Sequence, residues 1–258
     1  MSQSTSLRDL LELEEVEVDL YRAPHVYADP SHLYGGQVAA QALRAAAATV
    51  ESDRFPHSMH GYYLRPGNSA ERTIFEVYRD RDGHSFSARR VVARQDGNVI
   101  FNMSSSFHVD EEGPASQVVC APFVDAPDSC PPIALERAVA VEARDAAPER
   151  ETEWPMQYWT RCPDDLGSDR VLQACALTYL SDGSTGLAPF ADSTHRPLAS
   201  LDHAVWFHRP ARADHWLLND MVPGAIAQGR GWYTGSIFDQ DGRLVASIAQ
   251  EALFRRRG

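Results

Sequence analysis

Few side chains in this sequence have the types and spacing needed for chemistry. Asp202 and His203 stand side by side, and a carboxylate with an imidazole can carry out general acid–base catalysis. They lie in an extended run, where consecutive residues point to opposite faces of a sheet, so we do not expect them to share one site. Asp182, Ser200 and Gln250 each fit an ordinary structural role, as a turn residue after a helix, a strand-edge hydroxyl and a polar residue in an alternating strand.

Two other features have the chemistry of a binding site. Gly35 and Gly36 open an Ala-rich stretch that predicts a helix, and backbone N–H groups at a helix start can meet a negatively charged ligand. Arg89 and Arg90 lie in a predicted hairpin with Arg94, and arginine suits the phosphate groups of a nucleotide. A solvated strand face is the alternative explanation of these arginines.

The composition excludes several kinds of chemistry. All 24 basic residues are Arg, so neither a Schiff base on Lys nor a phosphate-binding loop with Lys is available. With 36 acidic residues the net charge is −12, so we expect no binding to nucleic acid. The sequence contains no G-x-S-x-G or H-E-x-x-H motif. Because the four cysteines form no C-x-x-C pair and no His cluster accompanies them, we expect no metal and no cofactor.

The sequence also predicts where the protein works. No stretch approaches the roughly 18 uninterrupted apolar residues of a membrane span. Residues 1–15 are polar and acidic and lack the apolar core of a signal peptide. We therefore expect a cytoplasmic protein that is not inserted in a membrane, with its cysteines reduced.

The elements that must position these side chains are duplicated. Stretches 85–107 and 231–254 each contain two extended runs joined by Gln-Asp-Gly. Their turns, Asp96-Gly97 and Asp241-Gly242, lie 145 residues apart. Both predict a type I′ turn, in which the two central residues need a positive φ.

A second pair of segments repeats at nearly the same offset. Residues 59–66 (MHGYYLRP) and 203–210 (HAVWFHRP) are 144 residues apart, and both end in Arg-Pro ahead of a hairpin. Two matches in the same order indicate two copies of one unit. The offset aligns Gln250 with Ser105, so the copies differ there, and we expect one working site per chain.

Each copy begins with a predicted helix. The first covers residues 34–50, where the high Ala content favours a helix. The second covers residues 169–180, with apolar residues on one face and Ser168 as the expected N-cap. A helix packed on antiparallel hairpins predicts an α+β architecture.

The stretch between the copies is rich in Pro, Ala and acidic residues, which is typical of a connection. We expect a short helix in it at residues 134–144. The predicted domains are residues 1–112 and 154–258, with 113–153 as the linker.

Five segments carry a resemblance to a known family over nearly the whole chain: LYGGQVAAQAL (33–43), HSMHGYYLRPG (57–67), RDGHSFSARRVVARQDG (81–97), LASLDHAVWFHRP (198–210) and DGRLVASIAQEALFR (241–255). In these segments the sequence resembles the type II acyl-CoA thioesterases. The resemblance implies a tandem, or double, hotdog fold in which each unit is an antiparallel sheet wrapped around a central helix. It also implies hydrolysis of acyl-CoA thioesters to a free fatty acid and CoA.

The resemblance assigns roles to three residues. The family's catalytic Asp, Ser or Thr, and Gln match Asp182, Ser200 and Gln250. Such a set can orient a water molecule and take its proton, so water is the expected nucleophile. Asp202 is the alternative for the acid. The backbone at Gly35-Gly36 is the expected binding site for the developing oxyanion.

Other functions of this fold remain as alternatives. A hotdog hydratase would need its own Asp–His segment, which we do not find, and a non-catalytic acyl-CoA-binding protein would lack the polar triad. The resemblance further implies an acyl-CoA substrate and a homodimer or higher homo-oligomer.

Overall fold

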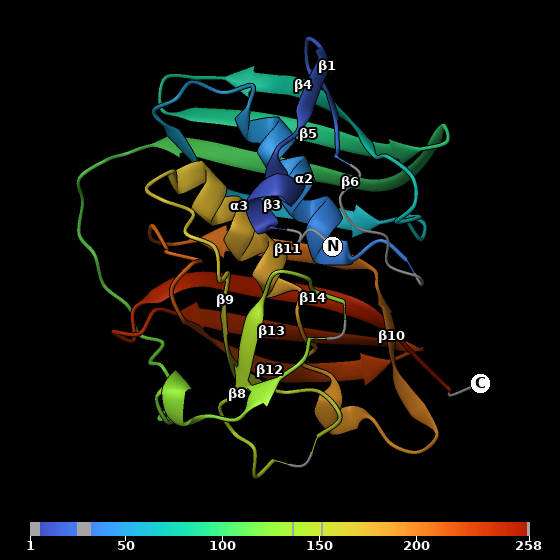
Figure 1. Ribbon diagram of the computed structural model, residues 1–258, viewed down its shortest axis with the longest axis vertical. Helices are drawn as coiled ribbons and strands as arrows, with labels where there is room; N and C mark the ends of the chain where they lie inside the picture. Colours follow the sequence, from blue (N-terminus) through green and yellow to red (C-terminus); the bar gives the residue numbers. More distant parts are fainter. Residues whose placement is uncertain (1–5, 25–31, 136, 151, 257–258) are drawn as a thin grey trace, which may run out of the picture.

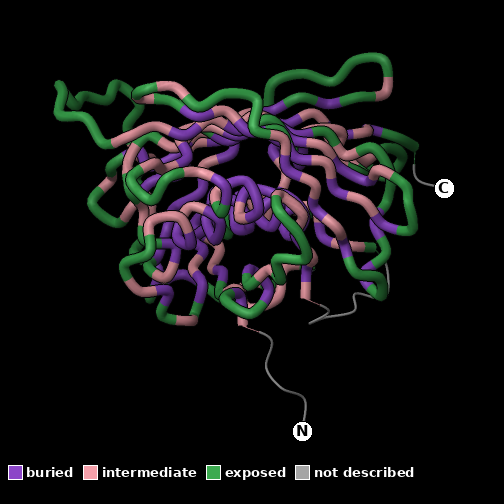
Figure 2. The backbone as a smooth tube through the Cα atoms, turned by 90° about the horizontal axis from the view of Figure 1, so that it is seen from above, coloured by how far each residue is buried: buried purple, intermediate pink, exposed green. Residues whose placement is uncertain are grey.

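Two helices lie side by side beneath a curved antiparallel sheet in the computed structural model of this chain (Figures 1 and 2). The structure describes residues 6–24, 32–135, 137–150 and 152–256. Seen from above, the buried backbone gathers in the helices and in the sheet that arches over them (Figure 2). The apolar core therefore lies between the helix pair and one face of the sheet.

The predicted helices are present. α2 (Gly35–Ala47) and α3 (Arg170–Ser181) pack against each other, and α2 is buried on nearly every side. Small side chains permit this close packing. A Cβ atom on Gly36 would lie 2.6 Å from the carbonyl oxygen of Tyr179, so only glycine fits at this crossing. A short helix, α1 (Leu7–Leu11), covers the other side of the pair.

The N-cap of α3 is one residue later than predicted. The carboxylate of Asp169 accepts hydrogen bonds from the backbone N–H groups of Val171 and Leu172, at 3.0 and 3.1 Å. Ser168 was expected in this role, but the first helical residue is Arg170, which places Asp169 at the cap.

In the described part of the chain all strands join one 14-stranded sheet. Its order is β1-β2-β4-β5-β6-β3-β11-β14-β13-β12-β9-β8-β7, and β10 pairs with β14 off this path. The strands are β1 (Glu14–Glu17), β2 (Leu20–Arg22), β3 (Arg54–Tyr63), β4 (Ile74–Asp82), β5 (Phe86–Gln95), β6 (Asn98–Val109), β7 (Pro132–Ile133), β8 (Glu142–Asp145), β9 (Gln157–Arg161), β10 (His195–Ser200), β11 (Asp202–Phe207), β12 (Leu217–Ala227), β13 (Arg230–Phe238) and β14 (Leu244–Arg256).

The two halves join at the segments that the sequence identified as duplicates. β3 and β11 pair antiparallel, with Gly61 opposite His203 and Met59 opposite Val205. Each half is thus an antiparallel sheet around one helix, and the two sheets continue into each other edge to edge (Figure 1). This is the tandem arrangement that the resemblance implied.

The two hairpin turns differ in form. Asp96 and Gly97 have φ values of 44° and 73°, which confirms the type I′ turn between β5 and β6. Gly242 has a φ of 75°, but Asp241 does not have a positive φ, so the second type I′ prediction is wrong. There the Asp239 carboxylate accepts hydrogen bonds from the N–H groups of Asp241 and Arg243 and holds a longer loop.

The short helix expected at residues 134–144 is not found in the described residues of that stretch. β8 pairs instead with β9 and β7, and it completes the edge of the second half. Pro131 and Pro132 favour extended backbone, and Ala140 has a φ of 54°, which is incompatible with a helix. Within the described residues no helix is long and apolar enough to cross a lipid bilayer.

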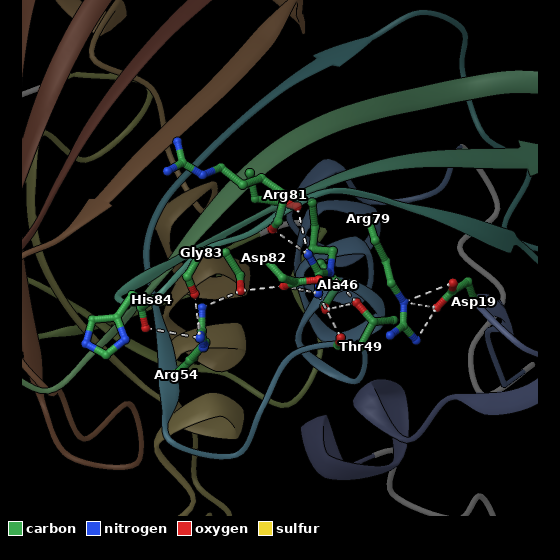
Figure 3. A network of polar contacts seen from close by, with 12 residues as sticks. Asp19, Ala46, Thr49, Arg54, Arg79, Arg81, Asp82, Gly83 and His84 are labelled. Carbon is green, nitrogen blue, oxygen red and sulfur yellow. Dashed lines mark hydrogen bonds and ion pairs between the residues drawn. The ribbon is translucent and has the colours of Figure 1, made fainter.

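Arg89 ties the sheet to the end of α2, and this corrects its assignment as a substrate-binding residue. Its side chain is 2 % exposed. The guanidinium donates to the hydroxyl and carbonyl of Thr49, at 2.7 and 2.9 Å, and to the carboxylate of Asp82 at 2.8 Å. It also donates to the carbonyls of Arg81 and Ala88. Figure 3 shows this network around Thr49 and Asp82. Every N–H group of the guanidinium has an acceptor, so none remains for a phosphate.

We predict that Arg89→Lys destabilises the fold. A single ammonium group cannot replace the five N–H donors of the guanidinium. Carbonyl oxygens that now accept from Arg89 would be left without a hydrogen bond. The free energy of unfolding in urea should fall by about 2 kcal/mol or more. Arg90→Lys is the matched control, because Arg90 is exposed and lies over the ring of Tyr78 at 4.2 Å. Its effect should stay within about 0.5 kcal/mol, and equal losses in both variants would contradict the prediction.

Candidate active site

Three polar side chains meet where α3 ends beneath β10 and β14. Asp182 is the C-cap residue of α3, Ser200 ends β10 and Gln250 lies in the middle of β14. The Gln250 amide donates to Ser200 Oγ at 2.6 Å and to Asp182 Oδ1 at 3.2 Å. The structure thus brings the three predicted residues together, while their role in catalysis stays a prediction.

They open into a cavity of about 740 Å³ that is shared by the two halves. Gly35 and Tyr63 line it from the first half, and Asp182, Ser200 and Gln250 line it from the second. Another cavity of about 500 Å³, beside Arg230 and Arg256, contains none of the three polar residues. The shared cavity is therefore the candidate site.

The environment of Asp182 combines one effect that opposes ionisation of the carboxyl with several that favour it. Burial raises the pKa of this carboxyl above its ordinary value. The charge of His203, the amide of Gln250 and the backbone N–H of Gly36 act in the opposite direction, toward a lower pKa. The carboxylate therefore depends on donors from α2, β11 and β14.

The start of α2 lies directly against Asp182. The backbone N–H group of Gly36 acts on the Asp182 carboxylate and lowers its pKa. A Cβ atom on Gly35 would lie 2.6 Å from Asp182 Oδ2 and 3.1 Å from the hydroxyl oxygen of Tyr63. The space beside Oδ2 is open only because residue 35 is glycine.

His203 also belongs to this cluster, which strand alternation alone did not predict. Its side chain is fully buried. One ring nitrogen, Nδ1, contacts Gln250 Oε1, and the other, Nε2, lies 2.8 Å from Ser181 Oγ. A signal was available, because the repeat aligns His203 with Met59, which is a core residue of the first half. A polar residue at a core position indicates a special role.

The opposite orientation of Asp202 and His203 is confirmed. Asp202 Oδ1 accepts a hydrogen bond of 2.7 Å from the N–H group of Glu251, and Asp202 does not line the shared cavity. His203 instead points inward to Gln250. Asp202 is therefore poorly placed for the acid role that was its alternative.

Three buried tyrosines lie within the electrostatic influence of the Asp182 carboxylate. Burial and the nearby charge of Asp182 raise the pKa of Tyr63, Tyr34 and Tyr233 well above the ordinary value, so these hydroxyls keep their protons. Tyr63 Oη is buried and has no hydrogen-bond partner among the described residues. Tyr63 thus lines the cavity and has an unused hydroxyl donor.

The arginines that line the cavity are not the two that were predicted from the sequence to bind substrate. Arg65, Arg137 and Arg196 line the cavity. Arg89 is enclosed in its own network, and Arg90 lies outside the cavity wall with its guanidinium 3.5 Å from Asp80. Within the described residues no group of three or more His, Cys, Asp or Glu side chains could hold a metal ion.

The fold is that of the hotdog proteins. A protein from Alicyclobacillus acidocaldarius described as having a hot dog fold superposes with a TM-score of 0.80, over 98% of both chains, although the two are only 18% identical. A helix wrapped by an antiparallel sheet, present twice, is thus a double hotdog.

Sequence comparison identifies the family within this fold. The profile of the acyl-CoA thioesterase N-terminal domain matches residues 24–108, and that of the C-terminal domain matches residues 110–254. The chain belongs to the acyl-CoA thioesterase family. It is 34% identical to acyl-CoA thioesterase 2 of Haemophilus influenzae, over 97% of each chain. The structure of acyl-CoA thioesterase II TesB2 from Mycobacterium marinum has a TM-score of 0.84 and 38% identity, over 98% of both chains.

The raised pKa of Asp182 predicts that Asp182→Asn stabilises the fold. Above the folded-state pKa the wild-type protein keeps a buried charge that the amide removes. The free energy of unfolding should therefore be higher in the variant at neutral pH. The gain should vanish as the pH falls below the ordinary aspartate pKa, where the carboxyl is protonated in both states.

Urea denaturation across this pH range measures the effect. Asp202→Asn is the control, since its Oδ1 can still accept from the N–H group of Glu251. A loss of stability in Asp182→Asn at neutral pH would show that the donors around the carboxylate outweigh its burial.

Proposed function

We propose that this chain hydrolyses acyl-CoA thioesters to a free fatty acid and CoA, with a water molecule activated by Asp182, Ser200 and Gln250. The observation that carries the proposal is the meeting of these three side chains in a cavity shared by both halves. Membership in the acyl-CoA thioesterase family supports the reaction and the substrate.

Asp182 is the proposed general base. The water donates one hydrogen to the carboxylate, and its oxygen attacks the thioester carbonyl carbon as that proton moves to Asp182. The tetrahedral intermediate then breaks its C–S bond, and the thiolate of CoA takes the proton back from Asp182. No bond forms between enzyme and substrate in this sequence of steps.

Ser200 holds the same water, and Gln250 holds Ser200 in position for it. Ser200 Oγ accepts a hydrogen from the Gln250 amide at 2.6 Å, which leaves the hydroxyl hydrogen of Ser200 free to donate to the water oxygen. A water that accepts from Ser200 and donates to Asp182 still has a lone pair for attack. Gln250 therefore acts by orienting the other two residues.

Tyr63 is the proposed donor to the developing oxyanion. Its hydroxyl lies on the side of Gly35 that also faces Asp182 Oδ2, and its proton has no acceptor among the described residues. One donor of this kind typically contributes about 3 kcal/mol to lowering the barrier. The backbone at Gly35-Gly36 is the alternative donor, although the N–H group of Gly36 also acts on Asp182.

The phosphate groups of CoA require cations, and the cavity wall supplies them. Arg65, Arg137 and Arg196 all line it, and the Nε atom of Arg196 is buried with no hydrogen-bond partner among the described residues. A phosphate oxygen is the natural acceptor for such a group. We place the nucleotide end of the substrate here and not at Arg89 or Arg90.

We also propose that the chain works in the cytoplasm as a homodimer or higher homo-oligomer. Its proposed units are residues 1–112 and 154–258, joined by residues 113–153, whose strands β7 and β8 extend the sheet of the second unit. Tyr62 and Trp206, from the central strands β3 and β11, are 58% and 37% exposed. Large apolar side chains on the outer face of a sheet favour association with another copy. Light scattering of the purified protein measures the mass of the assembly.

Removal of the Asp182 charge should abolish most of the activity. We predict that Asp182→Asn lowers kcat by about 100-fold or more, because the amide cannot take the proton of the water. KM should change little. Release of CoA thiol from acyl-CoAs of short to long chain length, followed with a thiol-reactive dye, measures both values. Asp202→Asn should retain wild-type kcat, and equal losses in the two variants would contradict the assignment.

A methyl group on residue 35 should also reduce turnover. Gly35→Ala places a Cβ atom against Asp182 Oδ2 and fills the space beside it. Because the methyl group displaces the Asp182 carboxylate and a small misplacement of a catalytic group is costly, we expect kcat to fall at least about 10-fold, with circular dichroism identifying the folded variant. Gly113→Ala is the control, because nothing lies within 4 Å of a Cβ atom there. Wild-type kcat in Gly35→Ala would show that this space is not used.

A further inference from the structure

His203 occupies a position in which both ring nitrogens are engaged and neither meets solvent. It lies on β11, between Gln250 of β14 and Ser181 of α3, and is 0% exposed. Whether each neighbour donates or accepts a hydrogen bond determines whether the ring nitrogen facing it carries a proton. The contacts therefore specify the charge of the ring.

Ser181 determines the state of Nε2. The Ser181 hydroxyl donates its single hydrogen to the carbonyl oxygen of Thr178, at 2.9 Å. Its oxygen can then only accept from His203 Nε2, which lies 2.8 Å away. Nε2 therefore carries a proton.

Gln250 determines the state of Nδ1. A carboxylate only accepts hydrogen bonds, so the side of the Gln250 amide that faces Asp182 is the NH₂ group. The amide oxygen, Oε1, is then left facing His203 Nδ1. Because an amide oxygen also only accepts, Nδ1 carries a proton as well.

We propose that His203 is a positioning residue: a buried imidazolium whose Nδ1–H group holds the Gln250 amide with its NH₂ toward Asp182 and Ser200. Without this donor the amide can rotate and present its oxygen to the carboxylate. Gln250 would then lose its two hydrogen bonds to Asp182 and Ser200, which orient those side chains. The link from this orientation to turnover rests on the proposed thioesterase function, while the protonation of the ring does not.

The charges that face His203 fit a cation. Asp182, from α3, is the carboxylate in electrostatic contact with it. Gly61 of β3 lies opposite His203 and contributes no charge, and Tyr63 and Tyr233 keep their protons. Arg137 also acts on Asp182, so the carboxylate is shared between two cations.

The proton positions can be measured without an activity assay. We would label the protein with ¹⁵N-histidine and assign His203 among the 10 histidines by the signal lost in His203→Asn. At neutral pH we expect both ring nitrogens of His203 to carry a hydrogen, seen as a one-bond coupling at each. A bare Nδ1 or Nε2 would overturn the proposal, whatever the protein hydrolyses.

A matched pair of variants tests the positioning role. An Asn side chain places its amide near the position of Nδ1 and keeps a donor for Gln250, whereas a Gln side chain places its amide near Nε2, toward Ser181. We expect kcat of His203→Asn to exceed that of His203→Gln by at least about 10-fold, with KM similar in the two. A ring that only fills space predicts equal kcat values, and that result would overturn the role.

Thermal unfolding and circular dichroism identify the folded variants, and the labelling experiment on the wild-type protein is independent of them. A wild-type protein that hydrolyses no acyl-CoA but shows a doubly protonated His203 would overturn the proposed function and leave the charge assignment in place. A wild-type protein that hydrolyses acyl-CoA but has a neutral His203 ring would overturn the charge assignment and leave the proposed function in place.

Discussion

The Asp182 carboxylate sits where α3 ends, and burial raises its pKa. A carboxylate removed from water costs several kcal/mol unless hydrogen-bond donors and a cation compensate it. The compensating groups come from three elements that are distant in sequence: the N–H group of Gly36 on α2, the amide of Gln250 on β14 and the ring of His203 on β11. They converge because α2 and α3 cross closely, and Gly36 permits that crossing against the carbonyl of Tyr179.

The two halves share one fold, and the site depends on positions at which their sequences differ. Met59 and Ser105 of the first half occupy the repeat positions of His203 and Gln250, so the first half lacks the groups that would hold a buried carboxylate. Its contribution is the start of α2 and the hydroxyl of Tyr63. One site therefore forms from two non-equivalent halves, and joining β3 to β11 in one sheet keeps them in register.

Periodic features of the sequence were sufficient to predict the helices and one hairpin turn, whereas the approach of Asp182, Ser200 and Gln250 was predicted from the family resemblance. The features that were missed depend on single tertiary contacts. Arg89 looks like a surface cation on an alternating strand, yet its side chain is enclosed because Thr49 and Asp82 supply acceptors from other elements. The helix expected at 134–144 became strand β8 because β9 offered an edge to pair with. His203 was excluded on strand alternation, which separates it correctly from Asp202 but says nothing of Gln250 across the sheet.

The hydrogen bonds from His203 through Gln250 to Ser200 and Asp182 all have the same donor-to-acceptor direction. This direction determines which donor and which acceptor face the substrate. Ser181 donates to Thr178, and His203 donates to both Ser181 and Gln250 when its ring is protonated on both nitrogens. Gln250 in turn donates to Ser200 and Asp182. Aligned donors strengthen one another in a medium of low dielectric constant. The hydroxyl hydrogen of Ser200 is then the last donor of the chain, and Asp182 is the acceptor beside it. A water between them is held by one donor and one acceptor, which orients its remaining lone pair. Reversal of the Gln250 amide would turn an oxygen toward both residues, and Ser200 would have to donate its hydrogen to Gln250 and not to the water.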